Sequence, residues 1–390
     1  MNLGNKKILV LVASQTNLPF IIAAKELGCY VLTCDNDKKN IGHKYADENL
    51  FIDVYDSNSI LKAIEGKNID AVTSFVSSHG LHSAAKISEL LGLNGYRFNN
   101  LNTLMDKGVF REFLKINSMS FPKFQHVTST EQILWDEITY PVIIKPTDSG
   151  GSRGVAIIRS EDELISNFEV SRENSKSGSV IIETFLENGS IINGDCLVSN
   201  NTIVASIVGD YIFDHEVNSV LPIATFFPTK ENYINAMEQL SKIVKLLDFP
   251  NGIFNFEAII KDNITYLIEI NPRPSGNYIW QLLGYNYDID ILKVLVQFYL
   301  NENNYLPIMK KNNNKYAYQI FYSDTCKEYK GVGFKQNMEN IIKKTIEFKE
   351  YNEPINPYNN LYDRAALSLL EMTNKEEELL YLNNINQFKL

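Results

Sequence analysis

The first hundred residues alternate between short apolar runs and segments with helical spacing. Four apolar runs predict strands, at 7–13, 29–34, 50–54 and 71–76. Helical segments lie between or after them, at 18–27, 60–65 and 81–91. Strands that alternate with helices predict an α/β unit with a parallel sheet, whose ligands sit beyond the carboxyl ends of the strands. Ser14, Asp35 and the pair Ser77–Ser78 are therefore expected near a site.

From about residue 100 the pattern becomes that of an α+β region. Helical structure is predicted at 103–117, 234–247 and 278–299. Strands are predicted at 141–146, 155–158, 180–186, 196–198 and 202–208. Asn-rich stretches at 301–304 and 310–314 predict linkers, and the remainder predicts a short α+β tail. A chain of 390 residues is expected to form two or three domains.

The segment 254–276 predicts a hairpin with polar residues on one face. Its two strands are joined by a tight turn at 261–263, so pairing would bring Glu257 close to Glu269. Asn271 lies two residues after Glu269 and shares its face of the strand. Two carboxylates and an amide oxygen suit a hard cation such as Mg²⁺. Arg273 adds a fork of hydrogen-bond donors that suits a phosphate. The alternative interpretation is a solvent-facing hairpin with ordinary surface charges.

A loop rich in glycine and serine occupies residues 148–154, just after a predicted strand that ends near Lys145. Such a loop can close its backbone N–H groups around phosphate oxygens. No Gly-Lys-Ser/Thr follows, so this is not the Walker pattern, and no Gly-x-Gly-x-x-Gly follows the first strand. Arg153 within the loop has two interpretations, a phosphate contact or a solvent-facing side chain.

Charge and composition exclude some classes of function. The net charge of −10 argues against a nucleic-acid-binding surface. No apolar run approaches the 18 residues of a membrane helix, and the run at 8–13 is too short for a signal peptide. The four scattered cysteines form no Cys-x-x-Cys pair and suggest reduced thiols, so we expect a cytoplasmic protein. His79 and His82 form a His-x-x-His pair, for which a polar cluster at a helix start is favoured over a metal site.

Seven segments, taken in order, resemble those of the ATP-grasp superfamily over roughly residues 6–300. They are Met105–Lys107, Val142–Pro146, Gly150–Val155, Ile182–Leu186, Asn193–Asp195, Gly252–Glu257 and Ile268–Gly276. The resemblance implies an ATP-grasp fold of the α/β and α+β classes. It implies an N-terminal parallel-sheet (pre-ATP-grasp) domain at 1–100, an ATP-grasp domain at 101–309 and a C-terminal α+β subdomain at 310–390. A mobile lid subdomain is expected at about 120–190.

The resemblance also implies roles for individual residues, with ATP and Mg²⁺ as cofactors. Lys107 and Lys145 would contact the nucleotide phosphates, under the mobile loop that contains Gly150, Gly151 and Ser152. Glu183 and Leu186 would hold adenine through backbone groups, and Asp195 would bind the ribose. Glu257, Glu269 and Asn271 would bind Mg²⁺. Arg273, with Lys145, would act in catalysis by steadying the transferred phosphate.

The run Glu269–Gly276 and the chain length are similar to those of L-amino-acid ligases and related carboxylate–amine ligases. The implied reaction forms an acyl phosphate from a carboxylate, couples it to an amine, with an amino acid as the expected amine, and releases ADP and phosphate. Substrate contacts are expected in 211–222, where His215 and Glu216 either meet the amine or lie in a loop, and in 275–280.

Two other interpretations of the sequence remain open. The first is an ATP-grasp enzyme with another acceptor, either carboxylase-like with bicarbonate or kinase-like. The second is a nucleotide-binding regulatory protein without turnover, against which the complete set of polar site residues argues. The expected partners are a small carboxylate and a small amine, with neither nucleic acid nor membrane, and the resemblance is compatible with a homodimer.

Overall fold

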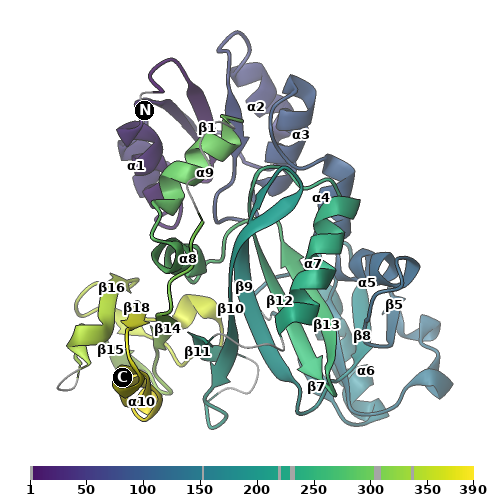
Figure 1. Cartoon of the computed structure of the whole chain (residues 1–390). Coiled ribbons are helices and arrows are strands. Elements are labelled where there is room, and N and C mark those ends of the chain that lie inside the picture. The colour runs from purple at the N-terminus through teal and green to yellow at the C-terminus, as the bar shows by residue number, and fades with distance from the viewer. Residues whose placement is uncertain (1–2, 152, 218–220, 229–232, 303–308, 335–337) are drawn as a thin grey trace.

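A parallel sheet of four strands begins the fold in the computed structural model, which describes residues 3–151, 153–217, 221–228, 233–302, 309–334 and 338–390. The strand order is β3-β2-β1-β4, with bounds β1 Lys7–Leu11, β2 Tyr30–Cys34, β3 Glu48–Leu50 and β4 Ala71–Thr73. This sheet lies at the top of Figure 1. The parallel pairing confirms the predicted α/β unit.

Alternate residues of β1 explain why both faces of this sheet are covered. Ile8 and Val10 pack with α1 (Leu18–Glu26), while Leu9 and Leu11 pack into the core cluster of α2 (Ser57–Ala63) and α3 (Leu81–Leu91). The third strand, β3, is shorter than the predicted strand at 50–54 and lies slightly before it in the sequence. The chain turns after it because Asp53 accepts the backbone N–H of Tyr55, and Asp56 then caps α2.

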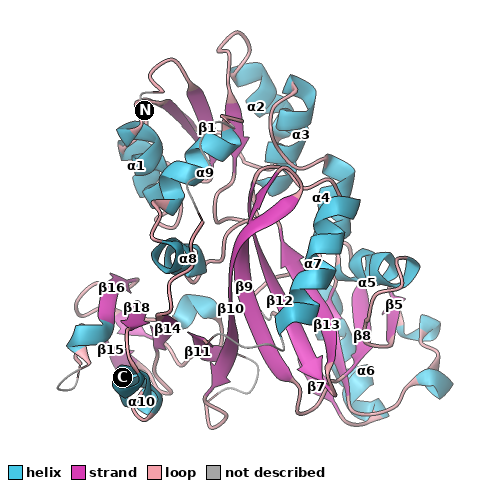
Figure 2. Ribbon diagram, viewed as in Figure 1, coloured by secondary structure: helices cyan, strands magenta, loops and turns pink. Residues whose placement is uncertain are grey.

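An antiparallel sheet of eight strands runs from the centre of the molecule to its lower left in Figure 2. Its order is β13-β12-β9-β10-β11-β14-β18-β16. Five strands come from the middle of the chain: β9 Ser190–Ser199, β10 Thr202–Phe213, β11 Pro222–Phe227, β12 Gly252–Lys261 and β13 Ile264–Asn271. Three more come from the tail: β14 Lys315–Phe321, β16 Ile342–Glu347 and β18 Ala366–Met372. The tail therefore extends the central sheet, beside a small pair of strands, β15 Lys327–Glu328 and β17 Pro354–Ile355, and helix α10 Lys375–Leu382.

A third sheet lies within the segment predicted as the lid. Its antiparallel order is β5-β8-β6-β7, with bounds β5 Phe124–Val127, β6 Val142–Pro146, β7 Ala156–Ile158 and β8 Val180–Thr184. Helix α6 (Glu161–Glu173) packs on it through Leu164 and Phe168. The loop between β6 and β7 carries the glycine-rich segment.

The remaining helices connect these sheets. Their bounds are α4 Phe98–Met105, α5 Lys107–Ile116, α7 Ile234–Leu246, α8 Ile279–Tyr287 and α9 Ile291–Tyr299. Helices α8 and α9 share one core with α1 and with the central sheet, whereas α7 packs on the opposite face of that sheet. Among the described helices, none is long and apolar enough to cross a membrane.

Candidate active site

The hairpin β12–β13 brings the predicted cation ligands onto one face of the central sheet. Its two-residue turn has positive φ at both Asp262 (50°) and Asn263 (62°), a conformation that Asp and Asn tolerate. This turn sets the register so that Glu257 lies directly opposite Glu269. Asn271 donates from Nδ2 to Glu269 Oε1 at 2.5 Å. The two carboxylates and the amide therefore lie close together, as the sequence predicted.

The electrostatics of this group fit a divalent cation. Burial and the neighbouring Glu269 raise the pKa of the Glu257 carboxyl, while Tyr211 Oη donates to Glu257 Oε1 at 2.6 Å. A bound cation would relieve the repulsion between the two carboxylates, and an all-oxygen donor set suits Mg²⁺. No group of three His, Cys, Asp or Glu ligands occurs in the described part of the chain, so the amide of Asn271 is needed to complete the set. The ligand roles of these residues stay a prediction.

Lys107 lies at the first position of α5 and points toward the hairpin. The helix begins there because the Asp106 side chain accepts the backbone N–H of Val109 at 2.9 Å. The predicted single helix at 103–117 was therefore wrong, because Asp106 breaks it into α4 and α5. Lys107 Nζ donates to the carbonyl of Ser149 at 2.8 Å and lies 3.7 Å from Glu269 Oε2.

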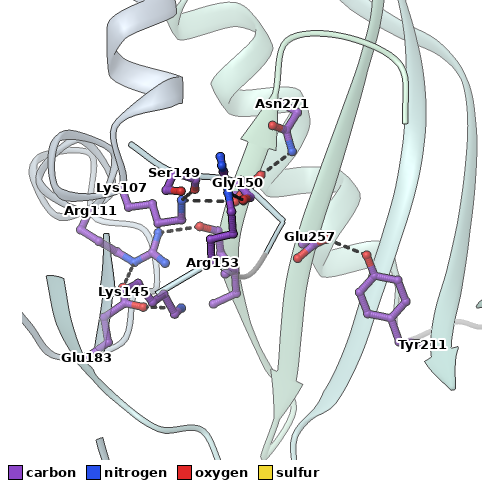
Figure 3. A network of polar contacts seen from close by, with 12 residues as sticks. Lys107, Arg111, Lys145, Ser149, Gly150, Arg153, Glu183, Tyr211, Glu257 and Asn271 are labelled. Atoms are coloured by element: carbon purple, nitrogen blue, oxygen red, sulfur yellow. Dashed lines mark hydrogen bonds and ion pairs between the residues drawn. The ribbon is translucent and has the colours of Figure 1, made fainter. Parts of the chain in front are cut away.

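A buried ion-pair group lies beside Lys107 (Figure 3). Glu183 Oε2 accepts from Lys145 Nζ at 2.8 Å, and Glu183 Oε1 accepts from Arg111 Nε at 2.5 Å. Burial alone would raise the pKa of Glu183, but Arg111 and Lys145 lower it to about 2. Glu183 lies inside β8 with strands paired on both sides, and its side chain is occupied by the two cations. The prediction that Glu183 holds adenine through its backbone does not fit this position; its side chain instead orients Lys145.

We expect Glu183→Gln to lower the free energy of unfolding by about 3–5 kcal/mol, because Arg111 and Lys145 would keep their charges without a buried counter-ion. The pKa of Glu183 is lowered from its usual 4.5, so its stabilisation is present above pH 4.5 and is lost as the pH falls toward 2. Urea unfolding at several pH values measures both effects. Glu187→Gln is the control, because the exposed pair of Glu187 with Arg159 contributes about 0–1 kcal/mol. Equal losses in the two variants would contradict the expectation.

The glycine-rich loop is anchored at its start by Asp148. This side chain accepts the backbone N–H groups of Lys176 and Ser177, each at 2.9 Å, and the hydroxyl of Ser175. Gly154 closes the loop with φ of 69°, where a Cβ would lie 2.9 Å from Asn174. The loop thus has fixed ends.

Ser149, Gly150 and Arg153 of the loop lie near Lys107 in Figure 3, and Lys107 donates to the Ser149 carbonyl. Gly150 and Gly151 have open space where a side chain would stand, and Gly151 has φ of 70°. Arg153 is exposed, and its Nε donates to the carbonyl of Gly150 at 3.3 Å. Ser152, also predicted to contact phosphate, lies outside the described residues. Phosphate binding by this loop stays a prediction.

Arg273 connects the hairpin to the N-terminal sheet. Its Nε donates to Ser78 Oγ at 2.8 Å, and its Nη1 donates to the carbonyl of Pro274 at 2.9 Å. Ser78 lies in the loop after β4, so the expectation that this loop approaches the site holds. Asp35, by contrast, accepts the backbone N–H of Ala13 and organises its own loop.

Asp195 is not placed to contact a ribose in this structure. It is fully buried on β9, where it accepts from Asn255 Nδ2 at 3.0 Å and from the backbone N–H of Ser275. Burial raises the pKa of its carboxyl to about 7. The ribose prediction therefore does not fit the geometry, and Asp195 instead positions the turn that follows Arg273.

Two further predictions concern Leu186 and the pair His79 and His82. Leu186 follows β8, and its carbonyl accepts the backbone N–H of Gly189. Its contact with adenine stays a prediction. His79 precedes α3 and packs near Tyr55, while His82 Nε2 contacts Asn102 Oδ1 at 3.0 Å. The two histidines have separate partners, which agrees with the polar-cluster interpretation.

One cavity in the described part of the chain lies away from this group. Its volume is about 630 Å³, and it lies between α7 and β10, where Ser206 and Val208 line it. Tyr211 points to the opposite face of β10, because side chains alternate along a strand. The cavity and the candidate site are therefore separated by the central sheet.

Sequence reasoning missed two residues that support the site, Arg111 and Tyr211. Arg111 is fully buried on the apolar face of α5, three residues before Leu114. A charged residue at an apolar helix position is the signal that would have identified it. Tyr211 was named only within the broad segment 211–222, because no sequence pattern marks its hydroxyl as a partner of Glu257.

Comparisons with known proteins identify similar sequences and a similar fold. Residues 104–277 match the model of a family described as the ATP-grasp domain. The chain is 25% identical over 272 residues to the "Carbamoyl phosphate synthase large chain, C-terminal section" of Methanocaldococcus jannaschii, covering 65% of this chain and 43% of that protein. It is 24% identical over 296 residues to the "Formate-dependent phosphoribosylglycinamide formyltransferase" of Prochlorococcus marinus, covering 73% of this chain and 75% of that protein. The chain thus spans less than half the length of the first of these relatives.

A solved structure extends the likeness over nearly the whole chain. The L-amino acid ligase from Bacillus licheniformis superposes with a TM-score of 0.82 at 16% identity, covering 98% of this chain and 97% of that one. At this identity the likeness establishes the fold. Together with the family match over residues 104–277, it shows that the chain has an ATP-grasp fold.

Proposed function

We propose that the protein is an ATP-dependent carboxylate–amine ligase that uses Mg²⁺ and releases ADP and phosphate. The observation that carries the proposal is the convergence of Lys107, Glu269 and Asn271 beside Glu257, with Lys107 Nζ 3.7 Å from Glu269 Oε2. Cations and carboxylates in this arrangement suit phosphoryl transfer, in which positioning and charge stabilisation provide most of the catalysis.

Each residue has a separate task in the proposed reaction. Glu257, Glu269 and Asn271 would hold Mg²⁺, which, when bound, offsets charge on the phosphate oxygens. Lys107 and Lys145 would bind the phosphates, and the pair with Glu183 keeps the Lys145 side chain in place. Arg273 would hold the transferred phosphoryl group against the substrate carboxylate. Ser78 fixes the guanidinium from the N-terminal side.

The more specific part of the proposal is the acceptor, the group to which the activated carboxylate is coupled. The fold is shared with a protein described as an L-amino acid ligase, which favours an amine acceptor. The relative named carbamoyl phosphate synthase supports keeping the second candidate, an ATP-grasp enzyme that handles bicarbonate or stops at a phosphorylated product.

Phosphate release from ATP and MgCl₂ separates these candidates. We expect slow release by the protein alone and stimulation when a pool of L-amino acids supplies both a carboxylate and an amine. Stimulation by bicarbonate without any amine would favour the carboxylase-like candidate. No stimulation by amino acids, by other small acids with amines or by bicarbonate would contradict the ligase proposal.

A further inference from the structure

Helix α7 and strand β10, both labelled in Figure 1, form two walls of a groove on the face of the central sheet opposite the candidate active site. Strand β10 pairs with β9 from its start, but it pairs with β11 only from Asp210 onward. Strand β11 ends before Pro228, which has no backbone N–H with which to extend the pairing. The sheet is therefore open beside Ser206 and Val208, and the groove of about 630 Å³ lies there.

The helical wall of the groove is largely apolar at one end. Ile234, Met237, Ser241 and Lys245 follow one another at intervals of three or four residues, so they share one face of α7. The side chain of Ile234 is 56% exposed, which leaves apolar surface uncovered at the groove. Val208 adds apolar surface from the sheet. These walls suit the apolar body of a small molecule.

The other end of the groove is basic. Lys242, Lys245 and Lys311 line it, and Glu238 is the one acidic residue among the described residues that do so. Lys242 Nζ donates to the carbonyl of Asn117 at 2.8 Å. Lys245 and Lys311 form no ion pair within the part of the chain that the structure describes. Two ammonium groups are therefore available to a ligand.

The charge and size of the groove indicate the class of that ligand. Glu238 offsets one of the two available ammonium groups, which leaves a single positive charge for a monoanion. Burial and the neighbouring Lys315 lower the pKa of the Lys311 ammonium, and a bound anion would relieve this repulsion. The volume lies within the range of about 300–1,000 Å³ that is usual for small-molecule sites.

We propose that this groove binds a small monocarboxylate with an apolar body, at a site separate from the candidate active site. The apolar body lies against Ile234, Met237 and Val208, and the carboxylate lies between Lys245 and Lys311. The central sheet separates this ligand from Glu257, because Val208 and Tyr211 lie on opposite faces of β10. The inference does not depend on the proposed ligase function.

Isothermal calorimetry with the full chain and 4-phenylbutyrate tests the inference. We expect a Kd below about 1 mM, and binding of 4-phenylbutyramide at least about fivefold weaker, because the amide lacks the charge. Lys311→Glu should weaken binding of the acid at least about fivefold. Lys310→Glu is the matched control, because it makes the same change of charge at the adjacent exposed residue, which does not line the groove. Ile234→Glu should also weaken binding, and its exposed position allows the variant to fold.

Saturating ADP and MgCl₂ should leave the affinity for 4-phenylbutyrate unchanged within about twofold, because the two sites lie on opposite faces of the sheet. Competition by ADP would place the acid in the active site and overturn the inference. Equal affinity for the acid and its amide, equal losses in Lys311→Glu and Lys310→Glu, or no binding of the acid would also overturn it. Tighter binding of phenyl phosphate than of 4-phenylbutyrate would contradict the assignment to a monocarboxylate.

Discussion

Replacing Glu269 with glutamine is expected to lower the turnover number by at least about 100-fold while the fold remains intact. Glu269 accepts from Asn271 Nδ2 through one oxygen and faces Lys107 with the other. Glutamine keeps the size of the side chain but removes the charge that a cation would neutralise. Asn271→Ala should have a comparable effect, because it removes the amide from the same group.

The measurement for these variants is phosphate release as a function of MgCl₂ concentration, together with direct Mn²⁺ binding. Both variants should bind Mn²⁺ more weakly than the wild type. Glu328→Gln is a suitable control, since its exposed pair with Lys330 lies in the tail. Normal phosphate release by Glu269→Gln would remove the metal assignment.

Replacing Arg273 with lysine should also lower the turnover number by about 100-fold, although the charge is retained. Arginine provides a planar fork, and Arg273 is held through Nε by Ser78 and through Nη1 by the carbonyl of Pro274. Lysine cannot keep these two contacts and also present a donor to the phosphoryl group. The KM of ATP should change little, because Lys107 and Lys145 remain.

Ser78→Ala provides a graded comparison for Arg273. It removes one hydrogen bond, worth about 0.5–1.5 kcal/mol, so we expect a loss of up to about tenfold in turnover. Steady-state kinetics with ATP as the varied substrate measures both variants. A lysine variant as active as the wild type would show that the fork is not used in the reaction.

The sequence predicted local features where neighbouring residues determine them. The turn at Asp262–Asn263 has residues suited to positive φ, and the opposition of Glu257 and Glu269 follows from that turn. The alternation of strands and helices before residue 100 likewise follows from hydrophobic spacing. Only the boundaries of these elements differ from the prediction. The third strand, for example, ends early because polar turn residues follow it.

Features that depend on distant partners were not predictable in the same way. The motif around Glu183 indicates a residue that holds adenine. In the fold, the side chain of Glu183 pairs with Arg111, which lies 72 positions away in the sequence. The motif around Asp195 indicates a ribose ligand, but in the fold this carboxylate is buried and accepts the backbone N–H of Ser275. The break at Asp106 is a local feature that helical spacing conceals, because apolar positions continue in register on both sides of the cap.

In the proposed reaction, this site transfers the terminal phosphoryl group of ATP to a carboxylate. The most direct test supplies the carboxylate substrate with oxygen-18 in its carboxyl group, together with the amine and ATP, and analyses the products. The mechanism predicts ADP, an amide and phosphate that contains one carboxylate oxygen, because the amine displaces phosphate from an acyl phosphate. Phosphate free of oxygen-18, or AMP and pyrophosphate as the main products, would contradict the account.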